Sequence, residues 1–208
     1  MDVEADQSMV LDGHSFAWSP DGSQLAYMGE ASYVWLAEGD GSNPLPVGEG
    51  YSVSWSPEGT QIAFFSAESN LKIYDLTTGE TKTVLDSSVL YAPFDLKGER
   101  VFVSGNSLVW SPTGEWIGFG VSQFGRTKLV EGGVALIHPD GGDLRISFSR
   151  EAGVALTGWS PDGRWLTSII QDRYDRARFT TTVIGVDGVP LLEADAWSVW
   201  SPGGRYLA

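Results

Sequence analysis

The sequence contains no cysteine and only two histidines among its 208 residues. Without cysteine the fold cannot depend on a disulfide, and thiolate chemistry is excluded. His14 and His138 lie far apart in the sequence, so they could form a zinc site only with carboxylate ligands. A Gly-x-Ser-x-Gly nucleophile elbow and a complete EF-hand calcium loop are also absent. We therefore expect a chain that is not an enzyme and that carries no metal or cofactor.

Basic residues are also scarce, because 13 Lys and Arg stand against 27 Asp and Glu, for a formal net charge of −14. Phosphate binding needs clustered Lys and Arg, which argues against a nucleic-acid partner. No stretch approaches the ~20 apolar residues of a membrane span, which argues against membrane insertion. The first ten residues lack the basic and apolar regions of a signal peptide. If the parent protein is exported, we expect this chain to be a mature form or an excised piece.

What the sequence does contain is a five-residue motif, Trp-Ser-Pro-Asp-Gly or a close variant, in five copies. The copies begin at Trp18, Trp55, Trp110, Trp159 and Trp200. Their spacing is near 40 residues with two longer intervals, and self-similarity at about this period is typical of propellers and other repeat arrays.

Each copy of the motif is predicted to be the turn of a β-hairpin, because β-prone apolar residues stand before and after it. Proline presets φ for a turn, and glycine permits the positive φ that closes it. The turn glycines are Gly22, Gly59, Gly114 and Gly163. Asp21 and Asp162 are interpreted as turn residues that accept backbone hydrogen bonds, with a role as ligands as the alternative.

A third and a fourth apolar run follow in each complete unit, and four antiparallel strands make one propeller blade. Runs such as residues 62–65 are apolar without alternation, so both faces of the sheet must be covered. We therefore predict an all-β propeller in which the repeated tryptophans pack between neighbouring blades. The expected units are residues 15–47, 51–86, 107–149 and 154–194, with a partial fifth at 197–208.

The sequence Phe-Ala-Trp-Ser-Pro-Asp-Gly at residues 16–22, followed by Gln-Leu-Ala-Tyr at 24–27, resembles the WD-like β-propeller repeat of the TolB type. The same repeat occurs in the propeller domains of prolyl oligopeptidase-type peptidases. The resemblance implies a ring of six or seven blades, so we expect a fragment of a longer propeller or one that is closed by something outside it. It also implies a bacterial protein in the periplasm or otherwise outside the cytoplasm.

The interval between Trp55 and Trp110 is long enough to contain something extra. Residues 91–103 align without a gap on residues 15–27, with Phe94 in the position of the tryptophan and Gly98 in that of the glycine. We interpret residues 91–104 as a degenerate hairpin inserted between two blades. The alternative is the start of an irregular blade that borrows strands from the next unit.

Two connections between second and third strands, in the third and fourth units, are longer than their counterparts and are rich in basic residues. The candidate ligand-binding residues there are Phe124, Arg126, Lys128, Arg173, Tyr174, Arg176 and Arg178. On an acidic protein, such a cluster is a candidate site for a carboxylate-rich peptide or another anion, because arginine donates paired hydrogen bonds and the aromatic rings supply flat contact area. The alternative is two extended hairpins with solvated charges.

A second candidate surface is aromatic. Trp116, Trp165 and Tyr206 each stand two residues after the glycine of their motif. They could stack on sugars or peptide, or they could pack between blades.

Three functions fit these features. The preferred one is a non-catalytic scaffold of the TolB type that binds a protein or peptide through one rim of the propeller. The second is the gating propeller of a prolyl oligopeptidase-type serine peptidase whose catalytic domain is absent from this chain. The third is a carbohydrate-binding propeller.

Overall fold

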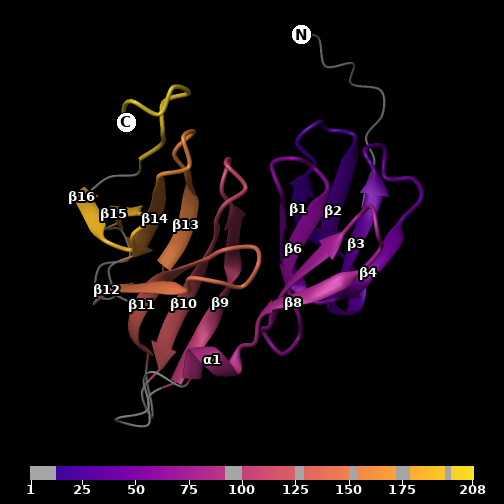
Figure 1. The fold of residues 1–208 in the computed structure, drawn as a ribbon, viewed down its shortest axis with the longest axis horizontal. Coiled ribbons are helices and arrows are strands. Elements are labelled where there is room, and N and C mark those ends of the chain that lie inside the picture. The colour runs from indigo at the N-terminus through magenta and orange to yellow at the C-terminus, as the bar shows by residue number, and fades with distance from the viewer. Residues whose placement is uncertain (1–12, 92–99, 125–128, 150–153, 172–178, 195–197) are drawn as a thin grey trace.

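The computed structural model describes residues 13–91, 100–124, 129–149, 154–171, 179–194 and 198–208. These ranges form four sheets, each of four antiparallel strands (Figure 1). The predicted all-β class is confirmed. The sheets are named the first to the fourth in chain order.

The strands of each sheet follow one another in sequence, so that every connection joins neighbours. The first sheet contains β1 (His14–Trp18), β2 (Gln24–Met28), β3 (Tyr33–Glu38) and β4 (Leu45–Glu49). The second contains β5 (Tyr51–Trp55), β6 (Gln61–Phe65), β7 (Leu71–Asp75) and β8 (Thr81–Leu85). The third contains β9 (Arg100–Trp110), β10 (Ile117–Phe124), β11 (Leu129–Ile137) and β12 (Arg145–Ser149). The fourth contains β13 (Val154–Trp159), β14 (Trp165–Gln171), β15 (Phe179–Gly185) and β16 (Pro190–Ala194).

The repeated motif joins the first and second strands of each sheet. In the fourth sheet the backbone N–H of Ser160 donates to Trp165 O at 2.7 Å, and the Trp165 N–H donates back to Ser160 Oγ at 3.0 Å. The other four copies have the same pair of hydrogen bonds. The turn glycines all have positive φ, as at Gly163, where φ is 68°. The serine of the motif therefore closes the turn, a role that the sequence reasoning did not assign.

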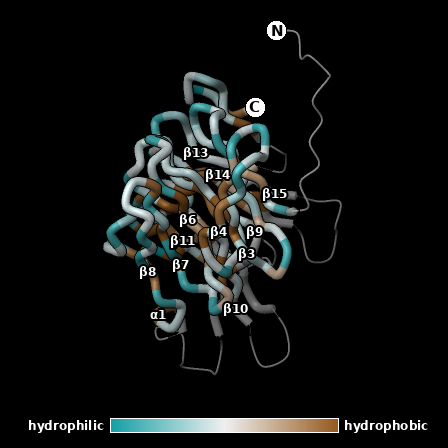
Figure 2. Tube along the Cα trace, turned by 90° about the vertical axis from the view of Figure 1, so that its right-hand side faces the viewer, coloured by the Kyte–Doolittle hydropathy of each residue, from teal (hydrophilic) through white to brown (hydrophobic). Residues whose placement is uncertain are grey.

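The four sheets pack side by side through their first strands. β5 lies against both β1 and β9, and β9 lies against β13. Hydrogen bonds tie these strands together: the Trp110 N–H of β9 donates to Ser54 Oγ of β5 at 2.9 Å, and the Leu156 N–H of β13 donates to Ser107 Oγ of β9 at 3.2 Å. Apolar segments lie in the middle of the stack and polar segments at the turns (Figure 2). The first strands thus occupy the inner position that a propeller requires.

The repeated tryptophans lie at the boundary with the preceding sheet. Trp55 Nε1 donates to Ala17 O at 2.8 Å, and Trp159 Nε1 donates to Val109 O at 3.3 Å. These two rings and that of Trp110 are buried. Trp18 differs from the expected packing, because it is 56% exposed. Among the described residues no sheet precedes the first one, so the Trp18 ring lacks the packing against a preceding sheet that buries the other rings.

The segment expected to form an inserted hairpin, residues 91–104, is described only in part. Residues 92–99, which include Phe94 and Gly98, lie outside the described residues. Before them the chain forms a short helix, α1 (Ser88–Tyr91), and after them it enters β9 directly. Val103 pairs with Val121 of β10, so the expected second strand of the hairpin is the beginning of the third sheet's first strand. The register of β9 against β10 shifts between Val103 and Leu108, so the four residues between them are not paired regularly.

The partial fifth unit forms a short hairpin. Trp200 pairs with Leu207 as an isolated bridge, and the Val199 N–H donates to Ala208 O at 2.8 Å. Trp200 is half-buried.

Candidate functional site

The basic cluster that the sequence predicts falls almost entirely on segments outside the described residues. Phe124 is described by its backbone only, as the last residue of β10, paired with Leu129. The other six residues lie outside the described residues: Arg126, Lys128, Arg173, Tyr174, Arg176 and Arg178. The strands on either side of these segments are β10 with β11 and β14 with β15, which belong to adjacent sheets.

The strands that lead to these two connections are longer than their counterparts. β10 and β11 have 8 and 9 residues, and β14 and β15 have 7 each. The equivalent strands of the first and second sheets have 5 or 6 residues. The third and fourth sheets therefore extend further toward the end opposite the repeated turns.

The aspartates of the repeated turns are engaged in the turns themselves. Asp162 accepts hydrogen bonds from Ser160 Oγ at 2.6 Å and from Arg164 Nε at 2.8 Å. The Ser160 hydroxyl and the Arg164 backbone N–H lower the pKa of Asp162 to about 2. The Ser19 hydroxyl has the same effect on Asp21 in the first sheet, whose pKa is also about 2. These carboxylates stabilise turns, and their hydrogen bonds do not point to a ligand.

The aromatic row does not form one surface. Trp116 is 6% exposed, its ring meets that of His138 edge-on at 4.0 Å between centroids, and the Arg145 guanidinium lies 4.7 Å above it. Trp165 is half-buried, whereas Tyr206 is 69% exposed. Trp116 therefore packs in the structure, and the three rings have three different environments.

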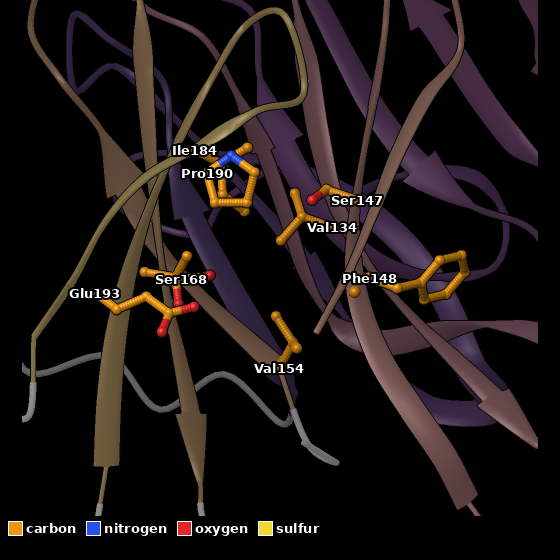
Figure 3. Close-up of a pocket in the computed structure, with 10 residues that line it drawn as sticks. Val134, Ser147, Phe148, Val154, Ser168, Ile184, Pro190 and Glu193 are labelled. Carbon is orange, nitrogen blue, oxygen red and sulfur yellow. The ribbon is translucent and has the colours of Figure 1, made fainter. Parts of the chain in front are cut away.

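A cavity that the sequence reasoning missed lies between the third and fourth sheets (Figure 3). Its volume is about 40 Å³. Its lining residues are Gly133, Val134, Ser147, Phe148, Val154, Ser168, Thr182, Ile184, Pro190 and Glu193. Figure 3 shows Ser168 and Glu193 on one side of the cavity, with Val134 and Ser147 across from them.

Three of the lining residues form a polar row across the fourth sheet. Ser168 of β14 pairs with Thr182 of β15, and Thr182 pairs with Glu193 of β16, so the three side chains share one face. Ser168 and Thr182 are 1% and 4% exposed, and neither hydroxyl has a hydrogen-bond partner. Such a pair is unusual, because buried polar groups are nearly always hydrogen-bonded.

Neither a metal centre nor a membrane helix is found in the part of the chain that the structure describes. Across these ranges, no three His, Asp or Glu side chains gather closely enough to hold a metal ion. No helix there is long and apolar enough to cross a bilayer.

The fold is similar to that of TolB from Acinetobacter baumannii, whose crystal structure superposes with a TM-score of 0.56 at 17% sequence identity. The match covers 93% of this chain and 47% of that one, so this chain spans about half the length of its structural neighbour. Four-stranded antiparallel sheets packed in this way form a TolB-like propeller fold.

Structural similarity extends to 705 solved chains. No protein-family model matches the sequence, and no curated protein matches it. Because a fold shared so widely serves many functions, the function has to be argued from the site.

Proposed function

We propose that this chain is a non-catalytic propeller scaffold that binds a protein or peptide through one rim. The observation that carries the proposal is the greater length of β10, β11, β14 and β15. In both adjacent sheets, the extra length of these strands lies at the end opposite the repeated turns. That end is free to vary in sequence, because the repeated motif and its hydrogen bonds lie at the other one.

The composition of these connections defines the ligand class. They carry five of the 13 basic residues of a chain with a net charge of −14, namely Arg126, Lys128, Arg173, Arg176 and Arg178. A positive cluster on an acidic protein attracts a negatively charged partner locally and repels one elsewhere. The preferred ligand is therefore a carboxylate-rich peptide or protein segment.

The resemblance to TolB also motivates a proposal on location. We place the protein in the periplasm of a bacterium, or otherwise outside the cytoplasm. Cell fractionation of the native host, with detection of the full-length parent protein, tests this placement. Recovery in the cytoplasmic fraction would contradict it.

The binding proposal is tested with an acidic probe peptide of alternating Glu and Tyr residues, titrated at low and at physiological salt. Replacement of Arg173, Arg176 and Arg178 by alanine should weaken binding at least tenfold and reduce its salt dependence. The melting temperature should stay nearly unchanged, because these residues lie on a connection. The control is Lys82→Ala with Arg205→Ala, which removes two exposed basic residues elsewhere and should leave binding intact.

Equal binding by the wild type and the triple variant, or no binding by either, would overturn the proposal. Binding of a neutral glycan in place of the peptide would instead support the carbohydrate-binding alternative. A hydrolase domain after this segment in the parent gene would support the gating propeller of a peptidase.

A further inference from the structure

The cavity between the third and fourth sheets exists because one position of the repeat differs in the fourth sheet. In each sheet the tryptophan of the motif pairs with one residue of the second strand. The residue two positions after that partner is a large aromatic one, Phe64, in the second sheet and Phe119 in the third. Both are almost fully buried and face the preceding sheet. Tyr27 occupies the same position in the first sheet. The fourth sheet has Ser168 there.

The difference extends across the strands. In the third sheet the row that starts at Phe119 continues through Ala135 to Ile146, and all three belong to or pack on an apolar cluster. The matching row of the fourth sheet is Ser168, Thr182 and Glu193. The third sheet thus fills the space between itself and the second sheet with the Phe119 ring. The fourth sheet leaves the corresponding space open and lines it with oxygen atoms.

Two buried hydroxyls without partners are costly, since an unsatisfied buried polar group destabilises a fold by about 1–3 kcal/mol. A bound group that hydrogen-bonds both hydroxyls removes this cost. About 10–15 Å³ of cavity volume is needed for one water molecule, so the cavity has room for about three groups of that size, which fits an ammonium group and the first carbons of an alkyl chain.

The chemistry of the lining selects the head group. Serine and threonine hydroxyls and the Glu193 carboxylate are all hydrogen-bond acceptors. None of the ten described lining residues is basic, and the chain has a net charge of −14. An anion is therefore disfavoured, and a cation with several N–H donors is favoured. Val134 on the opposite wall and Val154 on the fourth sheet are apolar and suit an alkyl chain.

We propose that this cavity binds a primary alkylammonium group, with its three N–H donors directed at Ser168 Oγ, Thr182 Oγ1 and the Glu193 carboxylate. The alkylammonium can come from a free short-chain amine or from a lysine side chain. This site is separate from the proposed rim, since it lies between sheets rather than on a connection, and its test is independent of peptide binding.

The test is an NMR titration of the isotope-labelled chain with n-butylammonium. The backbone signals of Ser168, Thr182 and Glu193 should shift and saturate together. The neutral n-butanol, of similar shape, and the anion butyrate should bind at least tenfold more weakly. N-acetyl-lysine methylamide presents the same group on a peptide backbone; saturable shifts with it would identify a partner's lysine as a source, and their absence would leave the free amine as the ligand.

Two variants separate the site from the fold. Glu193→Gln removes the charge of this lining residue and keeps the shape of its side chain. It should weaken n-butylammonium binding about tenfold and leave the affinity for n-butanol unchanged. The double change Ser168→Phe with Thr182→Ala installs the pair found at Phe119 and Ala135, and it should abolish binding while the chain stays folded. The matched control, Glu38→Gln, changes an exposed acid elsewhere and should have no effect.

Equal affinities for n-butylammonium and n-butanol would overturn the proposal in favour of an apolar cavity. Shifts that never saturate, or a crystal structure grown with n-butylammonium in which the cavity holds ordered water only, would also overturn it. Loss of folding in the double variant does not affect the outcome, because Glu193→Gln tests the same site through an exposed residue.

Discussion

The second and third sheets meet in a filled interface, whereas the third and fourth meet in one that is partly hollow. In the first case Phe65 and Phe119 pack edge to face at 5.5 Å between centroids, and both are fully buried. In the second, Trp159 and Leu166 pack against the third sheet near the repeated turn, and the cavity follows at Ser168 and Thr182.

The comparison separates two levels of information in the repeat. The five-residue motif and its glycine specify a hairpin, and they do so in the same way in every sheet. The residues across the middle of each sheet specify how it meets its neighbour. Since these residues lie outside the motif, the same fold can carry a packed interface in one place and a cavity in another.

The largest expected effect comes from truncation at the matched position in the two interfaces. Phe119→Ala should lower the free energy of unfolding by ~3–5 kcal/mol, because it removes a fully buried ring. Ser168→Ala should change it by less than about 1 kcal/mol or raise it slightly, since it removes an unsatisfied hydroxyl. Denaturant unfolding measures both. Similar losses in the two variants would contradict the difference between the interfaces.

A substitution with a smaller expected effect tests how far the cavity extends. It asks whether the interface of the third and fourth sheets is filled at Trp159, near the repeated turn, and hollow only further along the strands. A Cβ at Gly118 would lie 2.8 Å from Leu166 Cδ2 and 3.4 Å from Trp159 Cζ2. Gly118→Ala should therefore destabilise the fold by about 1–2 kcal/mol through overpacking, after the gain from a stiffer unfolded chain. Gly203→Ala, where a Cβ meets nothing within 4 Å, is the control and should be near neutral. A neutral Gly118→Ala would mean that the cavity reaches this level.

The smallest expected effect concerns the repeated turns, which have the same hydrogen bonds in all four sheets. The pKa of Asp162 falls from its usual 3.8 to about 2, so the folded state favours the charged form. The contribution of the charged Asp162 to the free energy of unfolding is complete above about pH 4 and is lost as pH falls toward 2. The difference in unfolding free energy between the wild type and Asp162→Asn should thus be constant at higher pH and shrink across this window.

Urea unfolding between pH 6 and pH 2 measures that difference, and Asp21→Asn should give the same profile, because Asp21 has the same serine partner in the first sheet. A difference that is independent of pH, or that appears in only one of the two turns, would contradict the equivalence of the turns.

The hairpins could be predicted from the sequence because the residues that determine them are close together in the chain. Proline, glycine and the flanking apolar runs act within a few residues, and they predict the turns at Gly22 through Gly163 without knowledge of any neighbour. The environment of Trp18 could not be predicted in this way, since its burial depends on which sheet stands in front of it. The register shift in β9 was missed for a similar reason, because it depends on the pairing of this strand with β10.

The cavity was missed because its signal is a difference between units rather than a motif. Ser168 is unremarkable alone, and it becomes informative only when the strand register places it opposite Thr182 and in the position of Phe119. The basic cluster of the connections, in contrast, was visible in the sequence, and its role stays a prediction.

The radial packing of the sheets is tested most directly by hydrogen exchange at the indole N–H groups, followed by NMR. The Trp55 and Trp159 indoles donate to carbonyls of the preceding sheet, at Ala17 and Val109, and should exchange slowly. The Trp18 ring is 56% exposed and its N–H should exchange rapidly. Equal, rapid exchange at all three indoles would contradict the packing of each sheet against the one before it.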